Sequence, residues 1–191
     1  VFADADIGAM ASAIALGATY NSGQDCTAAT RVYIDRRHFD DGVAALRERM
    51  ERIAIGDPRL DETDIGPLVS AEHRSRVHGY VARAADAGAE PLTGGAPLDG
   101  IGAYYPPTLV VGAEQDSEIV QGEVFGPVLH LATFGADGLD FEFRCFHNDP
   151  CLYPQNRKDR KEKPYRYQRC GLCVSVVKLK ICVGPWSKKA D

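Results

Sequence analysis

Apolar residues recur every three or four positions in three stretches of the first 90 residues, and this spacing predicts three amphipathic helices. Residues that cap helix N-termini precede the first and the third stretch. The predicted helices run from after Asp6 to near Gly17, from near Asp40 or Asp41 to Gly56-Asp57-Pro58, and from after Ser70 to near Gly88. Their apolar faces comprise Ile7, Met10 and Ile14, then Val43, Leu46, Met50 and Ile53, and finally Val77, Val81 and Ala84.

Three shorter stretches, residues 31–34, 108–111 and 128–134, are rich in β-branched and aliphatic residues and are predicted to be strands. Gly94-Gly95 predicts a turn and not a phosphate-binding loop, because the chain has no G-x-G-x-x-G or Walker pattern. Strands that alternate with helices are typical of parallel pairing. We therefore predict an α/β fold in which helices flank a parallel sheet.

Charge and cysteine content divide the 191 residues into two segments with different compositions. Residues 1–140 hold ten Arg, no Lys and 22 acidic residues, a net charge of −12, whereas residues 141–191 have a net charge of +7. Cys26 is the one cysteine of the first segment, and the other five all lie in the last 51 residues. We predict a partial domain over residues 1–137 and a separate basic, Cys-rich tail over residues 138–191.

We expect neither a membrane span nor a secretory leader. No run of 18 apolar residues occurs, which excludes a transmembrane helix. The first residues have no basic region ahead of an apolar stretch, so we do not expect them to be a signal peptide. We expect a cytoplasmic protein with no membrane partner, and a chain that begins inside a longer one, because Val1 is not an initiator methionine.

Residues 21–31 place Cys26 in a polar, glycine-containing loop between a predicted helix and a predicted strand. A thiol is a useful nucleophile only as the thiolate, which needs a stabilising environment. Backbone N–H groups at the start of a short helix over residues 27–30 would provide that environment and would also face an oxyanion. The alternative is a free cysteine that packs as a small hydrophobic residue.

Five short motifs in one order make the chain resemble the aldehyde dehydrogenase superfamily over residues 1 to about 137. They are residues 1–7 (VFADADI), 21–26 (NSGQDC), 64–68 with Ser70 (DIGPL-S), 105–109 (YPPTL) and 118–128 (EIVQGEVFGPV). The interval of 97 residues between Cys26 and Glu123 suits that family. Asp25 and the TAATR run after Cys26 are most similar to the branch that oxidises γ-aminobutyraldehyde and betaine aldehyde.

The resemblance implies roles for three residues. Cys26 would be the nucleophile that forms a thiohemiacetal with a small aldehyde, and a hydride would then leave to NAD or NADP, giving a thioester that is hydrolysed to the carboxylic acid. Glu123 would bind the ribose on the nicotinamide side, and Phe125 would pack beside the nicotinamide ring. Without the resemblance, Glu123 is typical of a solvated carboxylate and Phe125 of a core residue.

The resemblance also implies what these 191 residues do not contain. The dinucleotide-binding half of the family, its general-base glutamate and its oxyanion-hole asparagine all belong to a region that would precede Val1. Loss of each of these groups costs orders of magnitude in rate, so we expect no aldehyde turnover by this chain alone. The parent enzyme is expected to be a homodimer or homotetramer.

The tail from residue 138 departs from the family pattern and leaves three interpretations open. It is foreign or frameshifted sequence, a divergent end of the catalytic domain, or a small module that binds zinc or nucleic acid. A zinc site would draw on a CxxC pair and other candidate ligands, although one CxxC is a weak signal, and nucleic acid is disfavoured because short basic runs are usually solvated. The residues concerned are Cys145, His147, Cys151, Cys170, Cys173 and Cys182 for zinc, and 157–163 with Tyr165 and Tyr167 for nucleic acid.

Overall fold

A computed structural model describes residues 1–134 of the chain. The predictions for residues 138–191, including the zinc and nucleic-acid candidates, lie outside the described residues. The helices are α1 (Ile7–Thr19), α2 (Phe39–Glu51), α3 (Ala71–Asp86) and α4 (Glu118–Gln121), with short 3-10 turns at Tyr20–Gly23 and Arg36–His38. The strands are β1 (Arg31–Asp35), β2 (Glu90–Thr93), β3 (Thr108–Val111) and β4 (Val128–Phe134).

The four strands form one sheet in the order β1-β4-β3-β2. β4 is parallel to both of its neighbours, as the sequence predicts, but β2 is antiparallel to β3. The prediction of an all-parallel sheet is therefore wrong at this edge. The reason is that no helix lies between β2 and β3, and a direct return of the chain gives antiparallel pairing, whereas parallel pairing needs a crossover.

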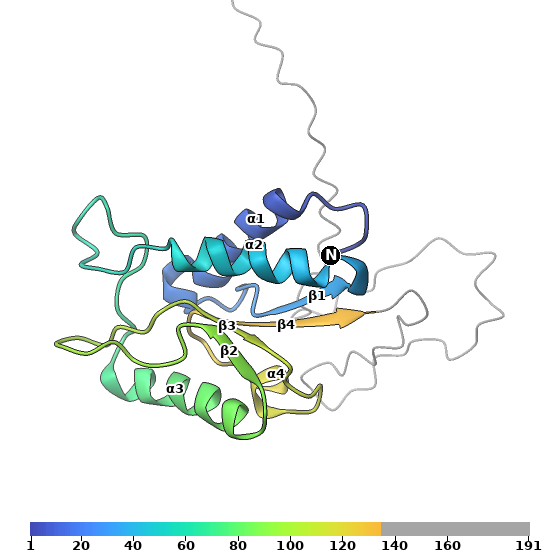
Figure 1. Ribbon diagram of the computed structural model, residues 1–191. Helices are drawn as coiled ribbons and strands as arrows, with labels where there is room; N and C mark the ends of the chain where they lie inside the picture. Colours follow the sequence, from blue (N-terminus) through green and yellow to red (C-terminus); the bar gives the residue numbers. More distant parts are fainter. Residues whose placement is uncertain (135–191) are drawn as a thin grey trace, which may run out of the picture. The chain divides into compact units, whose positions relative to one another are not determined.

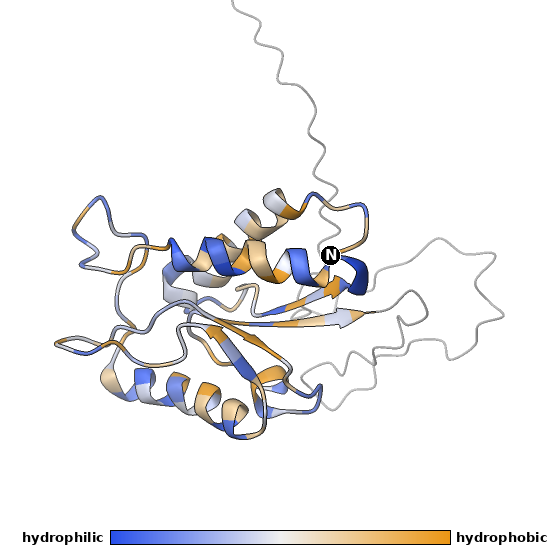
Figure 2. Ribbon diagram, in the orientation of Figure 1, coloured by the Kyte–Doolittle hydropathy of each residue, from blue (hydrophilic) through white to orange (hydrophobic). Residues whose placement is uncertain are grey.

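The sheet lies between two layers of helices, with α1 and α2 over one face and α3 and α4 over the other (Figure 1). Side chains of β4 alternate between these layers. Leu129 and Leu131 pack with α1 and α2, and Val128 packs with α3 and α4. All three side chains are buried, and apolar colour predominates along the central strands in Figure 2.

The helix starts follow the predicted caps. The Asp6 carboxylate accepts the Ala9 N–H at 2.8 Å, and the Ser70 hydroxyl accepts the His73 N–H at 3.0 Å. The apolar face predicted for the third helix is also confirmed, because Val77, Val81 and Ala84 of α3 are buried. No helix within residues 1–134 is long and apolar enough to cross a membrane.

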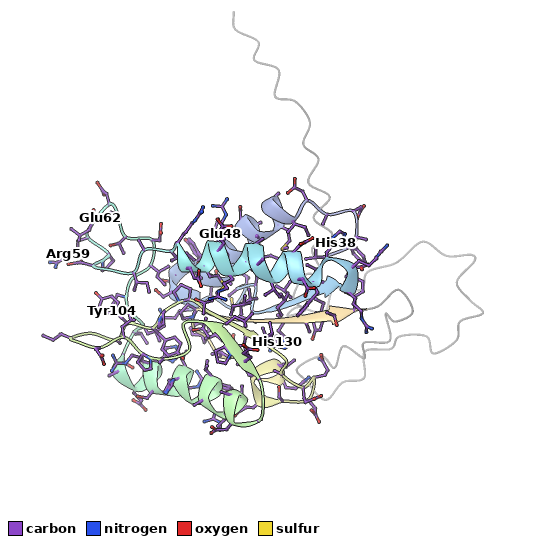
Figure 3. The ribbon with its side chains drawn as sticks, in the orientation of Figure 1. His38, Glu48, Arg59, Glu62, Tyr104 and His130 are labelled. Carbon is purple, nitrogen blue, oxygen red and sulfur yellow. The ribbon has the colours of Figure 1, made fainter. Side chains whose placement is uncertain are left out.

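His130 is a buried polar residue in the middle of β4 (Figure 3). It is 2% exposed, and neither ring nitrogen has a hydrogen-bond partner among the described residues. Burial lowers the pKa of His130 to about 4, and the positive charge of Arg31 contributes a smaller part of this shift. The Ala113 backbone has a weaker effect that raises the pKa. The ring is therefore neutral in the folded protein at neutral pH.

Truncation of a central core side chain tests the two-layer packing. Leu129→Ala removes a fully buried side chain from β4 and is expected to lower the free energy of unfolding by about 2 to 5 kcal/mol. Leu16→Ala, the same change at a residue of α1 that is 66% exposed, is expected to stay within about 0.5 kcal/mol of wild type. Urea denaturation followed by circular dichroism measures both values, and equal losses would contradict this packing.

The lowered pKa of His130 makes stability depend on pH. His130 binds a proton near pH 6.5 in the unfolded chain but only near pH 4 in the folded chain. A fall in pH from 6.5 to 4 therefore favours unfolding. The penalty is absent above pH 6.5, grows as pH falls, and reaches about 3 kcal/mol below pH 4. Denaturation of wild type and His130→Leu across this range is expected to show a flatter profile for the variant; parallel profiles would contradict the assignment.

Candidate active site

The loop that carries Cys26 begins with three consecutive residues in the left-handed backbone region. Asn21, Ser22 and Gly23 have φ values of 51°, 56° and 71°. The Ser22 hydroxyl donates to the Gly66 carbonyl at 2.9 Å, which ties this bend to the loop before α3. Left-handed non-glycine residues persist only where surrounding contacts hold them. The bend is therefore a fixed feature that directs the chain toward Cys26.

Cys26 is exposed, and it lies in a turn between Gly23 and β1. The predicted short helix over residues 27–30 is wrong, because the backbone N–H groups of these residues have other acceptors. Thr27 N–H donates to the Asp25 carboxylate, and the next three donate to the carbonyls of Asp25, Gly17 and Ala28. Within residues 1–134, the N–H of Cys26 itself has no acceptor.

Asp25, next to Cys26, carries a negative charge at neutral pH. One carboxylate oxygen accepts both the backbone N–H and the hydroxyl of Thr27, each at 2.8 Å. Those two bonds, with a smaller contribution from the Cys26 side chain, hold the pKa of Asp25 below its usual value. The nucleophile candidate therefore has a carboxylate for a neighbour.

The second candidate segment, residues 122–126, has no regular secondary structure and follows directly after α4. Glu123 is exposed and Phe125 is half-buried. Phe125 also has a left-handed backbone, with φ of 59°, which is unusual for a bulky residue. Both predicted cofactor residues thus lie on a backbone that needs support from outside the segment.

Three side chains, which we call the carbonyl clamp, supply that support. Irregular backbone leaves carbonyl groups without the partners that a helix or strand would provide. Here each of four carbonyl oxygens accepts a hydrogen bond from a side chain. The Arg31 guanidinium binds the carbonyls of Val120 and, at 2.9 Å, Gly122; Arg76 binds Glu123 at 3.0 Å; and His73 Nε2 lies 2.6 Å from the Phe125 oxygen.

The two candidate segments meet through glycine backbone. A Cβ built on Gly23 would lie 2.2 Å from the carbonyl carbon and oxygen of Gly126 and 2.5 Å from the nitrogen of Pro127. No side chain fits in that space, and the positive φ of Gly23 independently favours glycine. The structure therefore brings the Cys26 loop against the Glu123–Phe125 segment at this contact.

The clamp residues were not predicted from the sequence. His73 and His78 of α3 are both half-buried: His73 bonds Phe125, and His78 Nδ1 lies 3.4 Å from the Tyr105 hydroxyl. The one available signal was the position of Arg31, five residues after the cysteine at a strand start, where a basic residue needs a partner.

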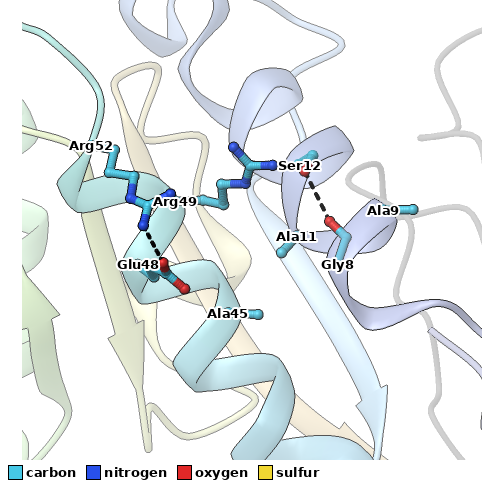
Figure 4. Close-up of a pocket in the computed structure, with 8 residues that line it drawn as sticks. All are labelled: Gly8, Ala9, Ala11, Ser12, Ala45, Glu48, Arg49 and Arg52. Carbon is cyan, nitrogen blue, oxygen red and sulfur yellow. Dashed lines mark hydrogen bonds and ion pairs between the residues drawn. The ribbon is translucent and has the colours of Figure 1, made fainter.

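The described residues form two surface hollows, and one of them adjoins this site. One, of about 450 Å³, lies between α1 and α2, is floored by small residues and holds the Arg52–Glu48 ion pair beside Arg49 (Figure 4). The other, of about 460 Å³, adjoins the start of the Cys26 loop at Asn21 and Ser22. Among residues 1–134, no group of three His, Cys, Asp or Glu side chains is placed to hold a metal ion.

The contact between the two segments predicts a difference between two glycine substitutions. Gly88→Ala places alanine at φ of 99° with no atom within 4 Å of the new Cβ, and is expected to cost about 1 to 2 kcal/mol of unfolding free energy. Gly23→Ala adds the clash with Gly126 and is expected to cost about 1 to 3 kcal/mol more. Urea denaturation gives both values; an equal cost would mean that the close approach does not exist.

The aldehyde dehydrogenase family model matches residues 1–138. Betaine aldehyde dehydrogenase of Vibrio vulnificus is 38% identical over 138 residues, and lactaldehyde dehydrogenase of Escherichia coli is 39% identical over 135 residues. Each match covers 70% of this chain and 28% of the relative. The chain thus spans little more than a quarter of the length of these proteins.

Solved structures agree with these matches. A variant of aldehyde dehydrogenase from Bacillus cereus gives a TM-score of 0.69 at 32% identity, over 71% of this chain and 28% of that one. The NAD⁺ complex of the Bacillus cereus enzyme gives 0.68 at 33% identity, over 70% and 27%. Since the family model spans more than half of the chain and the described fold superposes on solved members, the chain belongs to the aldehyde dehydrogenase family.

Proposed function

We propose that residues 1–137 form part of the catalytic domain of an NAD(P)-dependent aldehyde dehydrogenase, with Cys26 as nucleophile and Glu123 and Phe125 as cofactor-binding residues. The observation that carries this proposal is the backbone contact between Gly23 and Gly126. It joins the loop of an exposed cysteine to a segment with an exposed carboxylate and a half-buried aromatic ring. Proximity of nucleophile and hydride acceptor is what this chemistry needs.

Cys26 begins the proposed reaction. Its thiolate attacks the aldehyde carbon, a carbon–sulfur bond forms, and the carbonyl π electrons move to oxygen to give a thiohemiacetal oxyanion. The Cys26 N–H, which has no acceptor within residues 1–134, donates to that oxygen. The N–H groups of residues 27–30 do not contribute, because all four are already bonded.

The residues present fit the nicotinamide end of a dinucleotide. The Glu123 carboxylate is exposed and would accept hydrogen bonds from the hydroxyls of the nicotinamide-side ribose, while its backbone carbonyl is fixed by Arg76. The half-buried ring of Phe125 offers a flat apolar surface to the nicotinamide. A bound NAD(P)⁺ would supply the hydride acceptor for the thiohemiacetal carbon, and Cys26 would then carry a thioester. Relatives include an NAD⁺ complex, which supports NAD as the first cofactor to test.

Release of the carboxylic acid requires water to attack the thioester. No carboxylate of the described segment is assigned as the base for that step, and most of the dinucleotide site is not contributed by residues 1–134. We therefore propose that the 191 residues alone form the covalent adduct but do not turn over, and that the parent enzyme is a homo-oligomer. Residues 138–191 form a separate, basic segment in this proposal.

Asp25 suggests the substrate class. Its carboxylate is anionic and adjacent to Cys26, so it attracts an aldehyde that carries a positive charge. Relatives named betaine aldehyde dehydrogenase agree with a cationic substrate, and the relative named lactaldehyde dehydrogenase does not require one. We propose an amino or trimethylammonio aldehyde as substrate.

Protection of Cys26 against alkylation tests the nucleophile and the substrate class together. The purified chain is incubated with betaine aldehyde or with 3,3-dimethylbutanal, the neutral analogue of the same shape, and then treated briefly with iodoacetamide. Trypsin releases Cys26 in the peptide of residues 1–31, which separates it from the five tail cysteines. We expect about 1.4- to fivefold stronger protection by betaine aldehyde, since a solvent-exposed charge pair contributes about 0.2 to 1 kcal/mol.

Asp25→Asn is the matched variant, and in this variant the two aldehydes are expected to protect Cys26 equally. No protection of Cys26 by either aldehyde would contradict its role as nucleophile. Equal protection in wild type would overturn only the substrate class. In parallel samples that contain the aldehyde and NAD⁺ but no iodoacetamide, NADH absorbance is expected to stay flat, and a sustained NAD⁺-dependent rate would show that the isolated chain is a complete catalyst.

A further inference from the structure

One face of α3 lies along the entire proposed cofactor segment. His73 and Arg76 donate to carbonyls of this segment, as described above. Val77 lies beneath Gly126, where a Cβ would come within 2.8 Å of it, and Tyr80 lies beneath Gly122, where a Cβ would come within 2.9 Å. These four α3 residues follow the spacing i, i+3, i+4 and i+7 of a single helix face.

The strongest constraint on this face is at Phe125. A bulky residue with φ of 59° returns to the negative-φ region unless another contact prevents it. The short contact of 2.6 Å between His73 Nε2 and the Phe125 carbonyl is such a contact. A carbonyl oxygen only accepts, so Nε2 carries the proton and donates. The His73 and Phe125 rings also meet edge to face, with centroids 6.1 Å apart.

We infer that His73 is a positioning residue that keeps Phe125 in its left-handed conformation and thereby presents Glu123 and Phe125 to the cofactor. The reference to the cofactor rests on the proposed function; the backbone constraint does not. Rotation of Phe125 to negative φ would redirect both its ring and the Gly126 carbonyl. Because Gly126 is the residue that contacts Gly23, His73 also maintains the contact between this segment and the Cys26 loop.

Chymotrypsin cleavage after Phe125 tests this inference without any cofactor. The protease binds its substrate as an extended strand, so a left-handed Phe125 is a poor substrate. In His73→Leu, cleavage at this bond is expected to rise roughly tenfold over wild type, as mass spectrometry of the fragments measures. Cleavage after Leu46, which is fully buried in α2 and is followed by Arg47, reports general unfolding and provides the denominator.

Two variants separate the hydrogen bond from other effects. His73→Gln keeps an N–H donor but loses the ring, and it is expected to restore near-wild-type resistance after Phe125. His78→Leu makes the same substitution on the same helix, away from the segment, and is expected to leave the ratio unchanged. If circular dichroism shows that His73→Leu does not fold, the same cleavage ratio is measured for His73→Ala instead.

The outcomes distinguish this inference from the proposed function. An unchanged Phe125-to-Leu46 cleavage ratio in a folded His73→Leu or His73→Ala variant overturns the positioning role. Failure of His73→Gln to restore resistance also overturns it, because the donor would then not be the cause. In a parallel sample, protection of wild-type Cys26 from alkylation by millimolar NAD⁺ tests the cofactor proposal. If NAD⁺ gives no protection, the cofactor role of Glu123 and Phe125 is contradicted, whereas the positioning role of His73 is still decided by the cleavage ratio alone.

Discussion

The candidate site depends on the absence of one Cβ atom. Gly23 packs on the backbone of Gly126 and Pro127 at a distance that no other residue permits. Through this contact two segments almost 100 residues apart in sequence come together: the loop of Cys26 and the segment of Glu123 and Phe125. The parallel strands β1 and β4 bring the segments near each other, and the glycine contact sets their final separation.

A contact between two irregular segments needs rigid neighbours on both sides. Irregular backbone has unpaired carbonyl groups and is held by side-chain donors or by water. Here α3, which packs one face on the core, and the first residue of β1 supply the donors, so the carbonyl clamp ties the cofactor segment to a packed helix and to the sheet. On the other side, Ser22 ties the nucleophile loop to Gly66. The reactive residues themselves remain exposed or half-buried, and thus available to ligands.

Local patterns predicted most of the fold and little of the support around the site. Caps at Asp6 and Ser70 and the strand at 108–111 were predicted correctly because each depends on neighbouring residues. β2 was missed because its Pro91 and flanking charge resemble a loop, and with it the antiparallel edge. The clamp was missed for a different reason: hydrogen bonds from side chains to distant carbonyls leave no periodic pattern in the sequence.

Nuclear Overhauser contacts report directly whether Gly23 packs on Gly126 and Pro127. In the isotope-labelled chain, we expect strong cross-peaks from the Gly23 Hα protons to Gly126 and to the Hδ protons of Pro127. Gly88, which has no atom within 4 Å of its Cβ position, provides the negative control. Absence of the Gly23 cross-peaks in a folded sample would contradict the account, because the nucleophile loop and the proposed cofactor segment would then not meet.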